Sequence, residues 1–135
     1  MRAWRWVLAL ALIVYAAQNA FFAIYSTSMK FGWVHATADM RRFAPLTNDT
    51  SVVQLAVGWV AIVLFVVTAL RLIRYRTAFG IYAVAFILSV GNWLSLKLGT
   101  VYNQTFTAAE QKFDYVLLAL MMSFGLAIWL VDRET

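Results

Sequence analysis

The sequence of 135 residues contains no cysteine, one histidine and one proline. The absence of cysteine excludes disulfide bonds, thiolate metal sites and thiol-based redox catalysis. A single histidine excludes a bis-histidine haem site within one chain, and a metal site built on it would need ligands from a partner. The proline, Pro45, lies between apolar segments, so no apolar segment carries this helix breaker.

Charged residues are also scarce, at 13% of the chain against about 25% in an ordinary soluble domain. None of them lies in the middle of an apolar segment. Proton-coupled pumps, voltage sensors and ion-coupled carriers usually hold an ionisable group at that depth, so the sequence argues against those classes.

The usual parts of an enzyme are missing from the sequence as well. It has no Gly-rich phosphate loop and no serine–histidine pairing in a motif. We therefore expect no catalytic activity, no catalytic or metal-binding residue and no cofactor, although a bound lipid or quinone is compatible with the composition. The net charge is +5, but the basic residues lie beside apolar segments and form no long patch. We therefore expect no nucleic-acid partner.

Apolar residues make up 64% of the chain, and the mean hydropathy is +0.77. A soluble domain of this size has too little interior to bury so much apolar surface. The pattern predicts an all-α fold with one membrane domain over residues 1–135, in which four transmembrane helices form an antiparallel bundle. The helices are expected near 4–25, 52–72, 78–98 and 108–131, each close to the ~20 residues that cross a bilayer.

Arginine residues predict the orientation of these helices. Three crowd the turn between the second and third helices, and three more lie on the same side near the ends of the chain: Arg71, Arg74, Arg76, Arg2, Arg5 and Arg133. The basic residues on the other side are spread over two longer loops. Because cytoplasmic loops are enriched in Lys and Arg, we expect both termini in the cytoplasm.

Two capping boxes predict where helices begin. Ser51 and Gln54 match the motif before the second helix, and Thr107 and Glu110 match it before the fourth. The hydroxyl accepts a hydrogen bond from the N3 amide, and the Gln or Glu side chain reaches back to the N-cap amide.

Two stripes of small residues are candidate helix-packing faces. One is Gly91, Ser95 and Gly99, and the other is Ala119, Ser123 and Ala127. Small residues four apart let helix backbones approach closely in lipid. The stripes are expected to pack within the bundle or against a partner chain.

Polar residues gather in the outer third of the predicted helices, away from the termini. This set comprises Gln18, Asn19, Asn92, Ser95, Lys97 and Asp114. Such residues hydrogen-bond between helices or approach the headgroups. Alternatively, they form an outward-facing polar pocket with Lys97 and Asp114 paired at its rim.

The first outer loop has a helical pattern near residues 33–43. Its apolar residues recur at 3-4-3 spacing, and its polar residues recur at 4-3 spacing on the opposite face: Trp33, Ala36, Met40 and Phe43, then His35, Asp39 and Arg42. This predicts a short amphipathic helix on the membrane surface, between the first and second transmembrane helices. The polar face is a candidate docking surface or a solvated face.

The order of several short motifs resembles a bacterial family of predicted small integral membrane proteins, domain of unknown function 2165. The motifs are Gln18-Asn19, Phe31-Gly-Trp-Val-His35 through Asp39-Met40, Gly91-Asn-Trp93, Tyr102-Asn-Gln104 with Ala108-Ala109, and Asp132-Arg-Glu134. The resemblance implies the four-span layout and a bacterial inner membrane. It implies no activity and no catalytic residue.

The sequence favours a non-catalytic accessory or structural subunit of a larger membrane complex, which packs through the small-residue faces. The expected partners are membrane lipid and either other membrane subunits or copies of the chain itself. The alternative is a homo-oligomer that binds or transports a small or lipidic molecule through the outer polar pocket. An outer-surface enzyme that uses His35 and Asp39 is a third reading.

Overall fold

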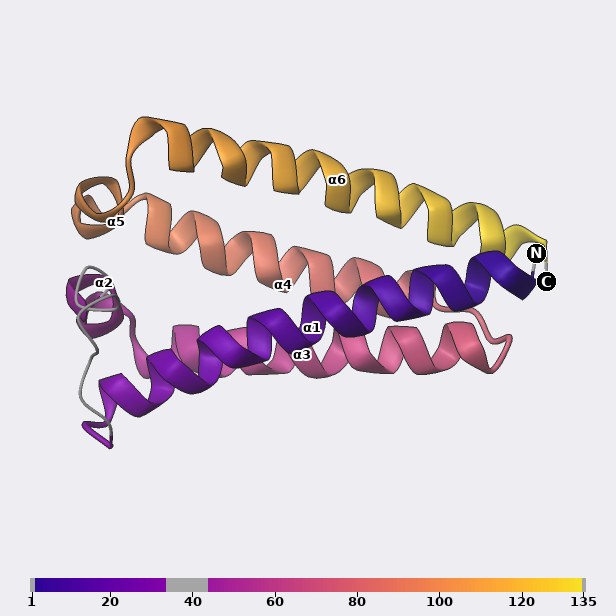
Figure 1. The fold of residues 1–135 in the computed structure, drawn as a ribbon, viewed down its shortest axis with the longest axis horizontal. Helices are drawn as coiled ribbons and strands as arrows, with labels where there is room; N and C mark the ends of the chain where they lie inside the picture. The colour runs from indigo at the N-terminus through magenta and orange to yellow at the C-terminus, as the bar shows by residue number, and fades with distance from the viewer. Residues whose placement is uncertain (1, 34–43, 135) are drawn as a thin grey trace.

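Six helices make up the fold in a computed structural model that describes residues 2–33 and 44–134. Four are long: α1 (Arg2–Lys30), α3 (Val52–Ile73), α4 (Phe79–Lys97) and α6 (Ala108–Arg133). Two are short: α2 (Ala44–Asp49) and α5 (Thr100–Thr105). Both termini lie at one end of the molecule, and α2 and α5 lie at the other (Figure 1). We call these the terminal end and the distal end.

The four long helices are long and apolar enough to cross a membrane. Only 11% to 22% of the residues in their most apolar stretches are buried inside the protein. A helix that is hydrophobic on its outer faces needs an apolar solvent around it. These helices identify an integral membrane protein.

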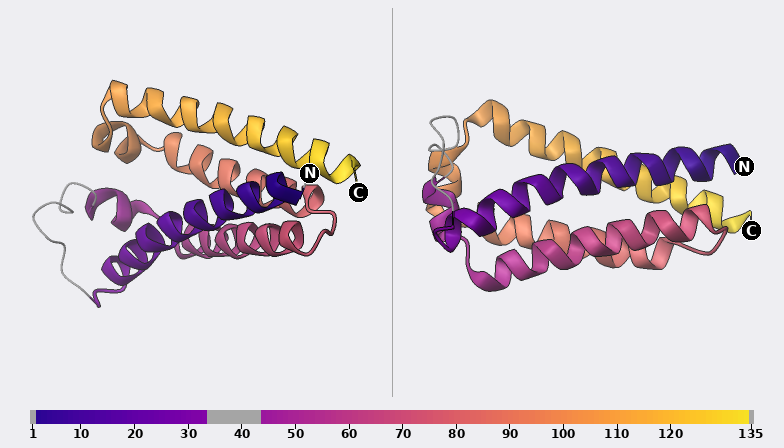
Figure 2. Two further views of the ribbon diagram at one scale, coloured as in Figure 1. Left: turned by 45° about the vertical axis from the view of Figure 1, so that its right-hand side comes forward. Right: turned by 60° about the horizontal axis from the view of Figure 1, so that its bottom comes forward.

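Each long helix contacts two of the other long helices. Helix α1 packs most extensively on α3, and α3 packs on α4, while α6 contacts α4 and, at fewer positions, α1. Helices α1 and α6 come together at the terminal end and separate toward the distal end (Figures 1 and 2).

The core occupies the half of the molecule nearer the terminal end. Its close contacts depend on alanines at helical spacing in α1, α3 and α4: Ala9, Ala16, Ala61, Ala69 and Ala85. Small side chains let the backbones approach, and larger residues such as Leu12, Phe65 and Ile128 fill the spaces between them. These alanines belong to neither of the predicted small-residue stripes.

The predicted helix starts are confirmed at both capping boxes. Ser51 caps α3 with Gln54 at N3, and Thr107 caps α6 with Glu110 at N3. The end of α1 lies further along the chain than the expected residue 25. Gly32, at φ +71°, donates its amide to the Met29 carbonyl at 3.2 Å and closes the helix there.

Helices α2 and α5 were not predicted. Each has six residues, which is too short to show a hydrophobic period. The amphipathic helix expected near 33–43 lies, apart from Trp33, outside the described residues.

A buried ion pair joins the helices at the terminal end. The Arg5 side chain is 2% exposed, and its Nη2 lies 3.6 Å from Asp132 Oδ1. Arg5 Nη1 also donates to the carbonyls of Leu72 and Arg76, at 3.3 and 3.2 Å. Asp132 Oδ2 accepts the amides of Ala78 and Phe79, at 2.8 and 2.7 Å. The cation therefore sits at the carboxyl end of α3 and the anion at the amino end of α4, as the helix dipoles favour.

Candidate functional site

A cavity of about 520 Å³ opens between the helices toward the distal end. Its floor is apolar and includes Ala61, Ile62 and Phe65. Its walls rise past Asn19 on α1 and Asn92 on α4 to the short helices α2 and α5. We call this space the distal cavity. Its volume lies within the ~300–1,000 Å³ that is usual for small-molecule sites.

A cluster of Asp114, Tyr102 and Trp93 forms one wall of the distal cavity. The Tyr102 hydroxyl donates to Asp114 Oδ2. Trp93 Nε1 lies 3.3 Å from the same carboxylate oxygen and 3.1 Å from the Tyr102 oxygen. The cluster joins α4, α5 and α6, and it supplies the one carboxylate among the described lining residues.

Burial favours the neutral form of this cluster's phenol. Tyr102 is 4% exposed. Its burial, together with the hydrogen bond to Asp114, raises the pKa of Tyr102 to about 12, because both disfavour the phenolate. The hydroxyl therefore remains a donor at neutral pH and holds the carboxylate in place.

Two asparagines add amide groups to the lining of the distal cavity. Asn19 donates its Nδ2 to the Tyr15 carbonyl at 2.8 Å, one turn earlier in α1. Asn92 lies beside Gly58 of α3, where a Cβ would be 3.6 Å from Asn92 Nδ2. An alanine Cβ at Gly58 would therefore be in ordinary van der Waals contact with the amide. Each side chain keeps a carbonyl oxygen that can accept a hydrogen bond.

A smaller hollow of about 190 Å³ borders the distal cavity. It shares Asn19, Ser89, Trp93 and Asp114 with the larger space and reaches Met121 on α6. The same polar groups therefore line both spaces.

Short hydrogen bonds position the mouth of the distal cavity. Lys30 Nζ donates to the Asn48 carbonyl at 2.7 Å and ties the end of α1 to α2. Trp59 Nε1 donates to Thr27 Oγ1 at 3.1 Å and joins α3 to α1. Helix α2 packs on α5 and contributes Thr47 to the lining, and Thr50, directly after α2, lines the cavity as well.

Three of the six residues predicted for a polar pocket line the distal cavity: Asn19, Asn92 and Asp114. Gln18 is exposed on α1 and lies outside the lining. Ser95 borders a separate shallow hollow, where it accepts a hydrogen bond from Gln54 at 2.8 Å.

The rim pair expected between Lys97 and Asp114 is replaced by other contacts. Lys97 Nζ lies 3.9 Å from the centre of the Tyr115 ring and 4.8 Å from that of Trp93, and it bonds to the Tyr115 hydroxyl. Asp114 bonds to Tyr102 and Trp93. Successive side chains of a helix point about 100° apart, so two residues at the same depth in the membrane need not face each other. The depth of Lys97 and Asp114 therefore did not decide whether they pair.

Sequence reasoning did not select Trp93 and Tyr102 for the pocket and used both as parts of the motifs that carry the family resemblance. The available signal was the neighbouring Asn92, which marks a polar face at that level of the helix. Tyr102 lies in a helix that the hydrophobic pattern did not reveal.

The predicted small-residue stripes lie mostly on the outside of this chain. Gly91, Ser95, Ala119 and Ser123 are exposed. Ala127 packs against the core, and Gly99 precedes α5 as its N-cap. The exposed members remain available to a partner.

The candidate docking face of His35, Asp39 and Arg42 lies outside the described residues. Within the part of the chain that is described, no group of three His, Asp or Glu side chains is placed to hold a metal ion.

Comparisons with known proteins supply no further identification. No family model matches the chain, and no curated protein or solved structure matches it. The resemblance to the bacterial membrane family therefore stays a prediction. What can be said of the chain's identity is that it is an integral membrane protein with four candidate membrane-spanning helices.

Proposed function

We propose that this protein crosses a bacterial inner membrane four times as an antiparallel bundle and holds one small amphipathic molecule in the distal cavity. Both termini lie in the cytoplasm, on the side of the arginine-rich turn between α3 and α4. The distal cavity then opens toward the outer half of the bilayer. The role is binding, without catalysis.

The observation that carries this proposal is that the inner end of the distal cavity is lined by apolar side chains, whereas polar groups join the apolar lining further toward the distal end. Phe65 and Ile62 lie at the floor, and Asn19, Asn92 and Asp114 lie higher. Ligand sites combine apolar lining with a few convergent polar groups that set orientation. A molecule with an apolar tail and a polar head fits this gradient with its tail toward the middle of the membrane.

The lining also limits the chemistry of the head. Two asparagine amides and the Asp114 cluster offer several acceptors and donors for hydrogen bonds. An uncharged head that carries carbonyl or hydroxyl groups, as in a quinone or a neutral lipid, pairs with them and leaves no buried charge unpaired.

Binding of decylubiquinone, which has an apolar tail and an uncharged polar head, tests the proposal. Purified protein in mild detergent should show quenching of tryptophan fluorescence that saturates at one quinone per chain. Asn19→Leu with Asn92→Leu removes two polar groups from the distal cavity at similar volume. We expect the double variant to weaken binding by about thirtyfold, since each of the two lost hydrogen bonds contributes about 1 kcal/mol.

Gln18→Leu is the matched control, because Gln18 precedes Asn19 but lies outside the cavity lining. This variant should bind the quinone as wild type does. Equal binding by wild type and the double variant would contradict a site at the distal cavity, as would equal weakening by Gln18→Leu. Mass spectrometry of solvent extracts from the purified protein then identifies the molecule that co-purifies.

A second candidate function is that of an accessory subunit in a larger membrane complex. The favouring observation is that Gly91 and Ser95 are exposed along one face of α4, beside a shallow hollow between α3 and α4. Native gels of gently solubilised membranes test it. The wild-type protein should migrate as a species much larger than one 15.3 kDa chain with its bound detergent. The Gly91→Leu variant should lose the partner and migrate as the single chain. A species that migrates alone would contradict this second function and leave ligand binding intact.

A further inference from the structure

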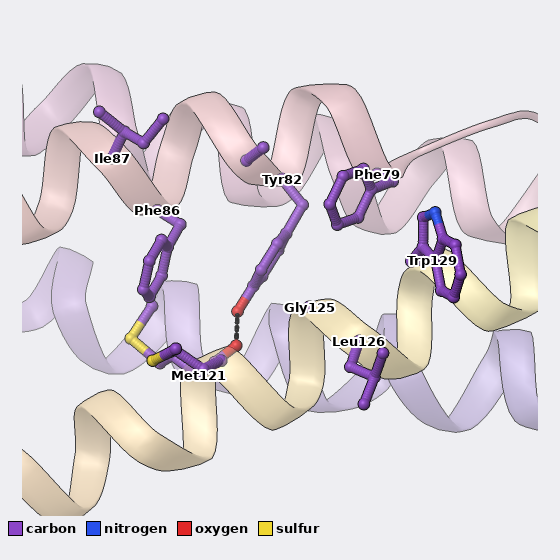
Figure 3. Close-up of a pocket in the computed structure, with 10 residues that line it drawn as sticks. Phe79, Tyr82, Phe86, Ile87, Met121, Gly125, Leu126 and Trp129 are labelled. Atoms are coloured by element: carbon purple, nitrogen blue, oxygen red, sulfur yellow. Dashed lines mark hydrogen bonds between the residues drawn. The ribbon is translucent and has the colours of Figure 1, made fainter.

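An apolar groove runs between α4 and α6 in the half of the molecule nearer the terminal end. It has a volume of about 500 Å³ and is lined by side chains that include Phe79, Phe86, Met121, Met122, Leu126 and Trp129. Figure 3 shows Phe79 and Trp129 at one end of this groove and Phe86 and Met121 at the other. We call it the α4–α6 groove. It shares no lining residue with the distal cavity.

Tyr82 connects α4 to α6 within the groove. Its ring lies over Gly125, where an added Cβ would come within 2.9 Å of Tyr82 Cε1. Its hydroxyl donates to the Met121 carbonyl at 2.6 Å (Figure 3). The buried ring thus lies between the two helices, packed closely on Gly125. The neighbouring Ile87 and Met122 side chains are 67% and 61% exposed, so the groove faces the surrounding lipid.

The groove ends beside a positive charge. Arg133, in the last turn of α6, places its Cζ 4.7 Å from the centre of the Trp129 ring. The adjacent Asp132 is engaged by Arg5 and by the first amides of α4. The apolar lining of the α4–α6 groove therefore ends at Trp129, and the Arg133 guanidinium lies over the ring of this residue.

We propose that the α4–α6 groove binds one acyl chain of a phospholipid whose anionic headgroup contacts Arg133. The lining has the character of an acyl-chain site, because aromatic rings and flexible methionines adapt to an irregular apolar chain. Arginine pairs strongly with phosphate, and tryptophan suits the boundary between hydrocarbon and headgroups. A partner helix would use the apolar groove but would not require a cation at its end. Charge complementarity therefore selects the lipid.

This inference goes beyond ligand binding in the distal cavity and does not depend on it. It requires only that α4 and α6 face lipid. Because the two sites share no residue, a negative result at one leaves the other standing.

Native mass spectrometry of the full chain in mild detergent tests the headgroup. Phosphatidylglycerol and phosphatidylcholine with identical acyl chains are titrated separately. We expect phosphatidylglycerol to bind about fivefold more tightly, from about 1 kcal/mol for one arginine beside an anionic lipid. Arg133→Gln should reduce this ratio to about one. Arg74→Gln, which removes an exposed arginine at the same end of the molecule, should leave it unchanged.

Brominated acyl chains test the position of the tail, because bromine quenches nearby tryptophan. Phosphatidylglycerol with brominated chains should quench wild-type fluorescence, and Trp129→Phe should lose most of the quenched component, whereas Trp4→Phe should not. Ala83→Leu and Met122→Phe narrow the groove and should each weaken binding of both lipids. Met122→Phe alters an exposed position, so it reports on the groove even where Ala83→Leu fails to fold.

Three outcomes would overturn the proposal. The first is equal affinity of the wild type for the two lipids. The second is a loss of selectivity in Arg74→Gln as large as in Arg133→Gln. The third is a change of oligomeric state in Met122→Phe with lipid binding unaltered, which would identify a second copy of the chain as the occupant.

Discussion

Arg5 and Asp132 form an ion pair between the first and last helices, with Nη2 and Oδ1 3.6 Å apart and the arginine side chain almost fully buried. Each partner also bonds to backbone groups at a helix end. Arg5 donates to the carbonyls of Leu72 in the last turn of α3 and of Arg76 in the turn that follows, and Asp132 accepts the amides at the start of α4. One contact therefore fixes all four long helices at the terminal end. The charges are retained there because each is both paired and hydrogen-bonded.

We expect Arg5→Met to lower the free energy of unfolding in detergent by about 3–5 kcal/mol, because it leaves a buried carboxylate without its cation. Arg5→Met combined with Asp132→Asn should recover most of this loss, since an asparagine oxygen still accepts the amides of α4 and carries no charge. Arg74→Met, at an exposed position, serves as the control and should change stability little. Full stability of Arg5→Met would show that the ion pair does not hold the helices.

Gly125 and Gly91 should respond oppositely to alanine. Gly125→Ala places a Cβ 2.9 Å from a buried tyrosine ring, and we expect a loss of about 1–3 kcal/mol from overpacking. At Gly91 an added Cβ would meet nothing within 4 Å beyond the neighbouring residues and backbone of α4, so Gly91→Ala should stabilise α4 by up to about 1 kcal/mol. Thermal unfolding of the two purified variants provides the comparison. Similar shifts for both would contradict the close approach of Tyr82 to α6.

Thr107→Ala should destabilise the protein by about 1 kcal/mol, because the Thr107 hydroxyl accepts the Glu110 amide at the start of α6. Thr107→Ser keeps the hydroxyl and should retain wild-type stability. The difference between the two variants in chemical unfolding isolates the cap. Equal stability of the alanine and serine variants would mean that water replaces the hydroxyl at no cost.

The Tyr102 hydroxyl should lose its proton at a higher pH than a free tyrosine does. Its folded pKa, about 12, lies above the ~10 of a free tyrosine, so this group stabilises the fold below pH ~10. That contribution is lost as the pH rises from ~10 through 12. The ultraviolet difference titration between wild type and Tyr102→Phe should therefore have its midpoint near 12. Asp114→Asn should move this midpoint toward ~10, because the carboxylate is one cause of the shift.

A midpoint for Tyr102 near ~10 in the wild type would contradict its burial against Asp114. A midpoint that Asp114→Asn leaves unchanged would assign the whole shift to burial.

Local chemistry made parts of the fold predictable. The capping boxes at Ser51 and Thr107 depend on residues three apart in the sequence. The predicted starts of α3 and α6 therefore agree with the structure. The end of α1 was expected at residue 25 and lies at Lys30, because the helix continues until Gly32, at a positive φ, closes it. The short helix α5 was not predicted, because six residues show no period and its Tyr102 gains its role from contacts with α4 and α6.

The polar pocket was predictable only in part, for a related reason. Asn19, Asn92 and Asp114 were selected because they are polar and lie at the same depth, and the packing turns all three toward one cavity. Gln18 and Lys97 met the same criteria, but their helices point them elsewhere. Depth along a helix follows from residue number, whereas direction around the helix follows from its neighbours.

By itself the sequence determined four segments long and apolar enough for a bilayer, because length and hydropathy are properties of each segment alone. It also determined the starts of two helices, which depend on a few adjacent side chains. Only the tertiary structure decided that Arg5 meets Asp132, that Tyr82 lies over Gly125, and that three distant polar residues share a cavity. Such contacts depend on the rotation and crossing of packed helices, and no single segment specifies these.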